Sequence, residues 1–388
     1  MTRPAMTEPP PPVADDSPRL RVAIDAGPLY GHRTGVGVAT AGLLDALATR
    51  HDIDLDPYVV SFRSKPADGH RRLPVPGIVA SHVWARSQWP RFDRWAGGAH
   101  VIHGTNYVVP PTRRPSVVSV YDCWFLRHPH HAVPVVRRAG ERLRRAITAG
   151  AFVHASSDDT AHHVRELFGT DRVATIHLGL PPAPPPLASL AQPEVGSSLR
   201  GNPFVLAIGT EERRKALPLL VAAFGSVAAE HTELRLVLAG AEGDASPTVE
   251  QAITALPASA RERVLRIGAV DDATKHWLLR RAAVLAYPSL DEGFGFPILE
   301  AQLAATPVVA SDVGAVSEIG GDGVLLVDGR DPAAFASALG RAIGDGGLRL
   351  GLIEAGQRNV RRFDWADTAE RLVGLYRELV ADSAPAAA

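Results

Sequence analysis

A chain of 388 residues is too long for one ordinary hydrophobic core and predicts two domains of roughly 150–200 residues each. Its 41 basic and 42 acidic side chains leave a formal net charge of −1, so no overall field recruits nucleic acid or an anionic membrane. The single cysteine, Cys123, excludes an internal disulfide framework and cysteine-rich metal sites, which is typical of a reducing compartment.

The N-terminal segment up to Arg19 is rich in proline and acidic residues and lacks the apolar core of a signal peptide. No later run approaches the ~20 apolar residues of a membrane span. We therefore predict a disordered tail over residues 1–18 and a cytoplasmic protein, with peripheral contact at the inner membrane face left open.

The first folded segment begins with a strand pattern. Leu20–Ile24 is an apolar run that ends in Asp25, and a glycine-containing loop leads to a helical pattern from about Val38 to Thr49. This order is the βα unit of a parallel sheet. Further β-type runs follow at Val101–Ile102, Ser116–Val120 and Phe152–Ala155. Together they predict a first doubly wound domain over residues 19–180.

A second series of apolar strands predicts a second parallel sheet, in a domain over residues 203–360. Its members are Phe204–Ile208, Leu234–Leu238, Val264–Ile267, Val284–Tyr287, Val308–Ala310 and Val324–Val327. Residues 181–202 are predicted to be the linker, because their Pro-Pro-Ala-Pro-Pro-Pro run disfavours both sheet ladders and helix interiors. In the C-terminal segment 361–388, the amphipathic run Trp365–Val380 is expected to cap the fold or to return to the first domain.

The predicted fold class is therefore α/β, with two Rossmann-like parallel sheets that face each other. Ligands of open α/β sheets bind at the carboxyl ends of the strands. We expect the functional motifs directly after strands.

The segment from Glu292 to Glu300 follows the strand Val284–Tyr287 and turns through two glycines. Pro297 stands at the expected first helical position. Free N–H groups at a helix N-terminus suit an anion such as a diphosphate, whereas carboxylates suit hydroxyl groups. The pattern therefore indicates a ligand with a diphosphate middle and polyhydroxyl ends, as in a sugar nucleotide. A surface loop with two solvated glutamates is the alternative.

This segment resembles the Glu-x7-Glu signature of glycosyltransferase family 4, whose members are retaining enzymes of GT-B fold. The resemblance extends from about Leu20 to Tyr376 and is sharpest from Phe204 to Val327. It implies that Glu292 is catalytic and contacts donor-sugar hydroxyls, and that Glu300 holds the ribose. The donor-binding positions between them are Gly293, Phe294, Gly295 and Phe296.

Arg214 and Lys215 follow the first strand of the second domain. Arginine binds phosphate with a directional fork and lysine binds it as a point charge, so the pair can neutralise a diphosphate. The segment resembles the family motif Gly-Thr-x-Glu-x-Arg-Lys, which implies a catalytic role for both cations and donor contacts for Gly209 and Thr210. It departs from the motif at 213, where proline is common, and at Ala216, where asparagine is frequent. A solvated basic turn is the alternative.

In the first domain, the run from Arg33 to Thr40 contains Gly35 and Gly37 and resembles the family's N-terminal glycine loop near the donor phosphates. A dinucleotide-binding fingerprint would follow its strand immediately, which this run does not, so a nicotinamide site is not expected. The family places Arg and Tyr after the second glycine, whereas this chain has Val38 and Ala39, so one first-domain contact is expected to be missing.

Tyr121 and Asp122 end the strand Ser116–Val120 at a position where many relatives have His-Asp. By resemblance, Tyr121 would lie near the transferred sugar and Asp122 could receive the acceptor proton; structural roles are equally compatible. Glu318 resembles a family position at the back of the donor pocket, although a glutamate at a helix start explains it as well.

No metal or organic cofactor is predicted. The Asp52–Asp56 run offers an Asp-x-Asp pattern, but its alternation indicates an edge strand that enters Tyr58–Val60. None of the clustered histidines supplies a convincing ligand set. They are His128, His130, His131, His154, His162 and His163.

Tryptophans alternate with arginines in part of the first domain. The residues are Trp84, Trp89 and Trp95 with Arg86, Arg91 and Arg94, and a second basic cluster of Arg137, Arg138, Arg142, Arg144 and Arg145 follows. They could face a lipid-linked or phosphorylated acceptor. Packed tryptophans on a solvated face are the favoured interpretation.

The predicted function is a retaining hexosyltransferase of polysaccharide or glycolipid biosynthesis. The second domain would hold the nucleotide sugar, GDP-mannose as first choice and UDP-glucose next. The first domain would bind a glycan, lipid-linked or small-molecule acceptor, and closure would exclude water. No nucleic acid partner is expected. A sugar-nucleotide epimerase, a glycosidase that pairs Glu292 with Glu300 and a non-catalytic nucleotide-sugar binder remain alternatives.

Overall fold

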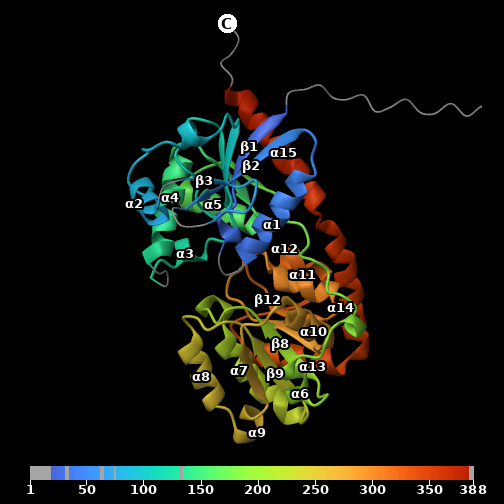
Figure 1. Ribbon diagram of the computed structural model, residues 1–388. Helices are drawn as coiled ribbons and strands as arrows, with labels where there is room; N and C mark the ends of the chain where they lie inside the picture. The colour runs from blue at the N-terminus through green and yellow to red at the C-terminus, as the bar shows by residue number, and fades with distance from the viewer. Residues whose placement is uncertain (1–18, 31–34, 62–64, 74–75, 131–133, 384–388) are drawn as a thin grey trace, which may run out of the picture.

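The computed structural model describes residues 19–30, 35–61, 65–73, 76–130 and 134–383. It has two lobes, one above the other in Figure 1, with the first in blue to green and the second in yellow to orange. The predicted tail, Arg33 in the glycine loop and His131 lie outside the described residues.

Within the described part of the chain, the first sheet has seven parallel strands in the order β3-β2-β1-β4-β5-β6-β7. The strands are β1 (Leu20–Asp25), β2 (Ile53–Val60), β3 (Arg71–Leu73), β4 (Val101–Gly104), β5 (Ser116–Val120), β6 (Phe152–Ala155) and β7 (Val173–Thr175). The Asp-x-Asp run belongs to β2, as predicted, but the expectation that β2 forms the edge is wrong, because β3 pairs outside it. The short strands β3 and β7 carried no sequence signal.

Helices pack on both faces of this sheet (Figure 1). They are α1 (Gly35–Ala48), α2 (Gly77–Trp84), α3 (Trp124–Arg127), α4 (Pro134–Thr148) and α5 (Asp158–Phe168). The side chain of Ser157 caps α5 by accepting a hydrogen bond from the Thr160 amide, and Gly169 ends the helix with φ 61°.

The second sheet has six parallel strands among the described residues, in the order β10-β9-β8-β11-β12-β13. They are β8 (Phe204–Ile208), β9 (Arg235–Ala239), β10 (Val264–Gly268), β11 (Val284–Tyr287), β12 (Val308–Ser311) and β13 (Val324–Val327). The helices of this lobe are α7 (Leu217–Glu230), α8 (Ser246–Thr254), α9 (Ala258–Arg261), α10 (Asp272–Arg281), α11 (Phe296–Leu303), α12 (Val316–Gly320), α13 (Pro332–Gly344) and α14 (Gly346–Asn359). This arrangement confirms the predicted pair of Rossmann-like sheets.

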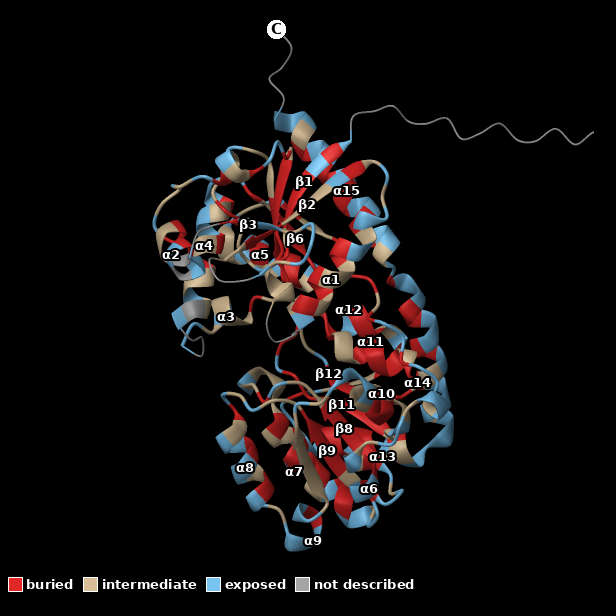
Figure 2. Cartoon of the chain, viewed as in Figure 1, coloured by how far each residue is buried: buried red, intermediate tan, exposed pale blue. Residues whose placement is uncertain are grey.

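The central strands of both sheets are largely apolar because both faces of each sheet are covered. Along β1, Ala23 packs into one core cluster, while Val22 and Ile24 pack into another on the opposite face. The second sheet is likewise buried between two clusters. In Figure 2 the buried strands run through the middle of both lobes and the exposed residues lie on the outer helices. Parallel sheets covered on both faces read as continuous apolar runs.

The last helix, α15 (Trp365–Ser383), packs against the first lobe. Leu372, Val373 and Tyr376 of α15 share a core cluster with β1 and α1. The Trp365 indole donates a hydrogen bond to the Leu180 carbonyl at 2.7 Å. None of the helices in the described ranges is long and apolar enough to cross a bilayer.

Residues 181–202, predicted to be a linker without helix, contain the short helix α6 (Glu194–Leu199). Leu199 packs with Phe204 and Trp277 in a cluster of the second lobe. The helix forms after the proline run, in the stretch from 194 to 202 that contains no proline.

Candidate functional site

The loop after β8 carries the two cations that the sequence singled out. Arg214 and Lys215 lie in a 3-10 turn, Arg213–Lys215, directly before α7. The turn ends at Ala216 with φ 44°, a left-handed conformation that asparagine adopts more readily than alanine.

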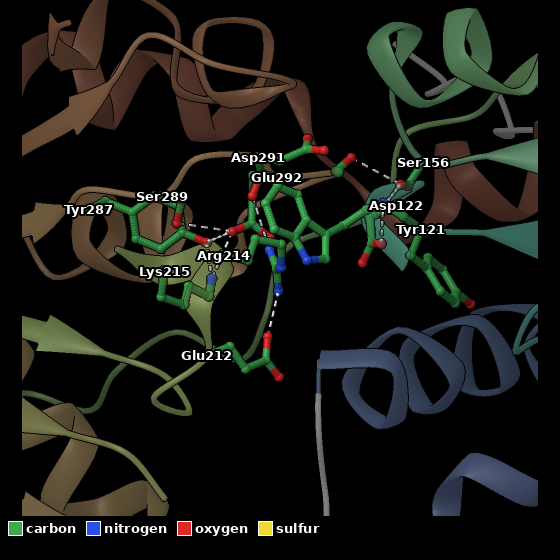
Figure 3. Close-up of polar contacts among 12 residues, drawn as sticks. Tyr121, Asp122, Ser156, Glu212, Arg214, Lys215, Tyr287, Ser289, Asp291 and Glu292 are labelled. Atoms are coloured by element: carbon green, nitrogen blue, oxygen red, sulfur yellow. Dashed lines mark hydrogen bonds and ion pairs between the residues drawn. The ribbon is translucent and has the colours of Figure 1, made fainter. Parts of the chain in front are cut away.

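Glu292 is buried and joins both cations, whose side chains are mostly covered, in one cluster (Figure 3). Arg214 Nη1 donates to Glu292 Oε1 at 2.7 Å, and Lys215 Nζ donates to Glu292 Oε2 at 2.7 Å. The Tyr287 hydroxyl also donates to Oε2 and accepts a 2.8 Å hydrogen bond from Lys215 Nζ. A single carboxylate thereby fixes the loop after β8 and the loop after β11 relative to each other.

Within this cluster, the carboxylate and the two cations stabilise one another's charged forms. Burial alone would raise the pKa of Glu292, but Arg214 and Lys215 outweigh it and hold the pKa at about 2. Burial lowers the pKa of Lys215, and Glu292 opposes that effect. Burial would also lower the pKa of Arg214, which Glu292 and Asp122 raise instead. Glu212 adds a second ion pair to Arg214 at 3.4 Å, so two carboxylates stand beside the two basic side chains, which are the groups here that suit a phosphate ligand.

Two helix N-termini approach each other beside this cluster. Gly295, with φ 92°, caps α11 and leaves Pro297 as the second helical residue, one place later than predicted. A Cβ placed on Gly35, the first residue of α1, would lie 4.0 Å from the Phe296 ring. Both helices direct amide groups toward the junction of the lobes, where an anion would be stabilised.

Glu300 makes a separate ion pair within the second lobe. Lys275 Nζ, from α10, donates to Glu300 Oε1 at 2.9 Å and also lies 3.1 Å from Asp272. A glycosidase needs one protonated carboxyl as its acid. Glu292, with its pKa near 2, cannot fill that role at neutral pH, and Glu300 is paired with an ammonium group, so this arrangement disfavours glycoside hydrolysis.

The first lobe brings Tyr121 and Asp122 against the same loop. A Cβ on Gly293 would lie 1.6 Å from the Tyr121 carbonyl oxygen, so only glycine permits this approach. Burial raises the pKa of the Asp122 carboxyl, which Arg214 partly offsets. The Tyr121 hydroxyl is buried and has no hydrogen-bond partner of ordinary geometry among the described residues.

The other predicted donor-binding residues occupy varied positions. Gly209 has φ 134° and begins the loop after β8, whereas Thr210 is exposed. Phe294 packs against Phe296 and Phe363 in the core between the lobes. Gly37 is buried in the first turn of α1.

Three residues that hold the candidate site in place were not predicted from the sequence. Tyr287 was read only as a strand residue, although a hydroxyl in an otherwise apolar buried strand is a usable signal. Lys275 is one of three lysines in the chain and stands in no motif that marks it as a partner of Glu300. Glu211 is fixed by Arg266, which donates to its two carboxylate oxygens at 2.6 and 2.5 Å, so it anchors the loop of Arg214.

The tryptophans and histidines that the sequence singled out mostly contact other parts of the protein. Trp84 is buried and donates to the Pro90 carbonyl at 3.1 Å, while Trp89 is 70% exposed. In the described ranges, ligand atoms of His162, His163 and Glu166 lie within 4.8 Å of one another on α5. His163 also contacts the Arg127 guanidinium at 3.0 Å, whose charge disfavours a cation there, and the absence of a metal stays a prediction.

The chain is similar in sequence to known glycosyltransferases. Residues 202–345 match the family model for glycosyl transferases group 1. The chain is 26% identical to the O-antigen chain mannosyltransferase B of Escherichia coli, over 93% of this chain and 100% of that protein. It is 29% identical to a D-inositol 3-phosphate glycosyltransferase of Xylanimonas cellulosilytica (95% and 84%) and to the phosphatidyl-myo-inositol mannosyltransferase of Mycobacterium leprae (86% and 86%).

Solved structures agree on the fold. Sucrose-phosphate synthase from Thermosynechococcus elongatus superposes with a TM-score of 0.71 at 21% identity, covering 94% of this chain and all of that one. An Anabaena protein solved with UDP and glucose gives 0.69 at 16% identity, covering 93% of this chain and all of that one. The two facing sheets therefore form a GT-B fold.

Proposed function

We propose that this chain, a group 1 glycosyltransferase, moves a hexose from a nucleotide sugar to a hydroxyl of a glycan, lipid-linked or small-molecule acceptor, with retention of the anomeric configuration. The family match and the mannosyltransferases among its relatives favour mannose from GDP-mannose as the donor. UDP-glucose is the second choice, since UDP and glucose are named for an Anabaena protein of this fold.

The cluster of Arg214, Lys215 and Glu292 carries the proposal. Lys215 uses two of its three N–H donors on Glu292 and Tyr287 among the described residues, which leaves one direction for a phosphate oxygen. Charge builds on the diphosphate as its bond to the anomeric carbon breaks, and prearranged cations stabilise that charge best. Arg214, Lys215 and the amides at the start of α11 would supply this stabilisation, without a metal or an organic cofactor.

The two glutamates would hold the ends of the donor. Glu292 remains ionised over the whole physiological pH range, so it can accept hydrogen bonds from sugar hydroxyls. Glu300, near the start of α11, would accept hydrogen bonds from the ribose.

The acceptor would approach from the first lobe. Its hydroxyl oxygen attacks the anomeric carbon on the face from which the diphosphate departs, so no protein nucleophile is required. We assign the acceptor proton to Asp122, because a buried carboxyl with a raised pKa is a better base than an exposed one. Tyr121 would shape the sugar-facing wall.

A lipid-linked acceptor would meet the face that carries Trp89 and the arginines of α4. Trp84, Arg142 and Arg145 line one hollow on this face, and Arg142 has a buried Nε without a hydrogen-bond partner among the described residues. We accordingly propose a cytoplasmic setting with contact to the inner membrane face.

The proposal is tested by incubating the purified chain with GDP-mannose, with UDP-glucose and with plain oligosaccharides. We expect release of a nucleoside diphosphate from a nucleotide sugar, and NMR of the first product should show the donor's anomeric configuration. Isomerised donor without diphosphate release would indicate an epimerase. Cleavage of plain oligosaccharides would indicate a glycosidase, and both results would refute the proposal.

A further inference from the structure

Glu318 lies on α12, a helix of the second lobe that sits at the junction with the first lobe (Figure 1). By resemblance it would stand at the back of the donor pocket. Its carboxylate instead reaches the first lobe. The Asp158 amide donates to both carboxylate oxygens, at 2.9 and 3.0 Å, and the Asp159 amide donates to one of them at 3.4 Å.

These amides are the first two of α5, which have no partner inside their own helix. Among the described residues, the Ser157 hydroxyl accepts a hydrogen bond only from the Thr160 amide. Glu318 therefore supplies the acceptors for the Asp158 and Asp159 amides. The His177 ring lies 2.6 Å from Glu318 Oε1 and adds a third first-lobe group. A carboxylate at a helix N-terminus is favoured by the helix dipole.

The other end of α12 is attached to the loop after β11, the donor loop, which carries Glu292. The Ala315 amide donates to the Glu292 carbonyl at 3.0 Å, and the Ile319 amide donates to the Ala315 carbonyl at 2.9 Å. A Cβ on Gly314 would lie 2.6 Å from the Glu292 carbonyl oxygen, so the segment before α12 packs tightly on the donor loop. One short helix therefore connects the backbone of Glu292 to the start of α5.

The start of α5 is itself tied to Tyr121 and Gly293. Ser156, two residues before α5, places its hydroxyl 3.1 Å from the carbonyl oxygens of both residues (Figure 3). Arg127 donates to Asp291 at 3.0 Å as a further contact between the lobes. These contacts hold Asp122 where it acts electrostatically on Arg214 and Glu292.

We propose that Glu318 is a positioning residue that fastens the two lobes together, rather than a ligand of the donor. Its carboxylate holds α5, and with it Tyr121 and Asp122, against the loop that carries Glu292. The catalytic consequence rests on the proposed function, whereas the mechanical role does not. The charged side chains proposed to hold the nucleotide, Arg214, Lys215 and Glu300, all belong to the second lobe.

The test compares Glu318→Ala and Glu318→Gln with Glu354→Gln, which alters an exposed glutamate of α14 in the same lobe. Spin labels on Arg137→Cys of α4 and Gln251→Cys of α8, both exposed, report the distance between the lobes. Calorimetry with GDP and with UDP reports binding to the second lobe, and single-turnover hydrolysis of GDP-mannose and of UDP-glucose reports the chemistry.

We expect both Glu318 variants to shift or broaden the distance distribution and to leave nucleotide binding unchanged. Single-turnover hydrolysis should fall about tenfold in Glu318→Ala, equivalent to about 1.4 kcal/mol, and less in Glu318→Gln. Glu354→Gln should match the unaltered chain. Weakened nucleotide binding with an unchanged distance distribution would overturn the proposal and make Glu318 a donor ligand. If the unaltered chain binds neither nucleotide and hydrolyses neither nucleotide sugar, the proposed function fails, and the distance measurement alone decides the role of Glu318.

Discussion

Lys215 is the residue whose removal should affect the chemistry most directly. Its ammonium group is buried and contacts Glu292 and Tyr287, so it is already oriented before the donor binds. We expect Lys215→Ala to lower the single-turnover rate of donor hydrolysis by about 10²–10³-fold, the usual effect of deleting one prearranged donor. Lys215→Arg keeps the charge and should lose less. Lys65→Ala, which alters an exposed lysine, should change nothing, and full activity of Lys215→Ala would contradict the phosphate role.

A substitution at Gly293 tests whether the two lobes approach as closely as the structure shows. A Cβ there would meet the Tyr121 carbonyl at 1.6 Å, and backbone cannot yield as a side chain can. We expect Gly293→Ala to destabilise the fold by about 1–3 kcal/mol, as overpacking does, because its Cβ would push the two backbones apart. Gly340→Ala is the matched control, because its Cβ would enter open space on α13 and should stabilise the helix by about 0.5–1 kcal/mol. Urea unfolding of both variants measures the difference, and equal stabilities would refute the steric argument.

At the scale of elements, a buried hydrogen-bond chain links α15 to the first sheet. The His154 Nε2–H donates to the Ile176 carbonyl, so His154 Nδ1 accepts from Ser119, at 2.9 Å in each case. Ser119 then accepts from His103 Nε2 at 2.8 Å, and His103 Nδ1 accepts from the Tyr376 hydroxyl at 2.6 Å. Each imidazole fits this chain only in its neutral form.

The two buried histidines of this hydrogen-bond chain are expected to make the stability of the fold sensitive to acid. Burial lowers the pKa of His154 to about 4 and that of His103 well below 6.5, the value in the unfolded chain. The unfolded state therefore binds more protons between pH 6.5 and 4, and stability is lost as pH falls through this window, by about 3 kcal/mol for His154 alone. Urea unfolding at pH 7 and pH 4.5 measures the loss. His154→Gln should lose less over this range than the exposed His162→Gln, and identical losses would argue against the buried chain.

The sequence predicted elements well where a single local signal decides them. β8 and β11 are apolar runs because both faces of their sheet are covered, and the glycines before α11 mark a turn. β3 and β7 were missed because three residues each, without alternation, resemble loop. Contacts between distant segments were also missed. Glu318 meets Asp158 across 160 positions, and no spacing in the sequence reports which helix start a glutamate will reach.

At the scale of the whole molecule, the two lobes share a core and a charge cluster. Phe294 of the donor loop packs with Tyr121 of the first lobe and with Phe363, just before α15. The proposed donor-binding groups lie in the loops after β8 and β11 of one lobe, while Asp122 lies in the other. An open arrangement would keep the donor contacts and lose Asp122, so closure is expected to control chemistry more than donor affinity.

Hydrogen–deuterium exchange tests the central claim, that a nucleotide sugar binds in the second lobe around Arg214, Lys215 and Glu292. Saturating GDP-mannose or UDP-glucose, with binding verified by calorimetry, should slow exchange in residues 209–215 and 291–300, whose amides and side chains would contact the diphosphate and sugar. Protection confined to the first lobe, or binding without protection of these two segments, would contradict the account.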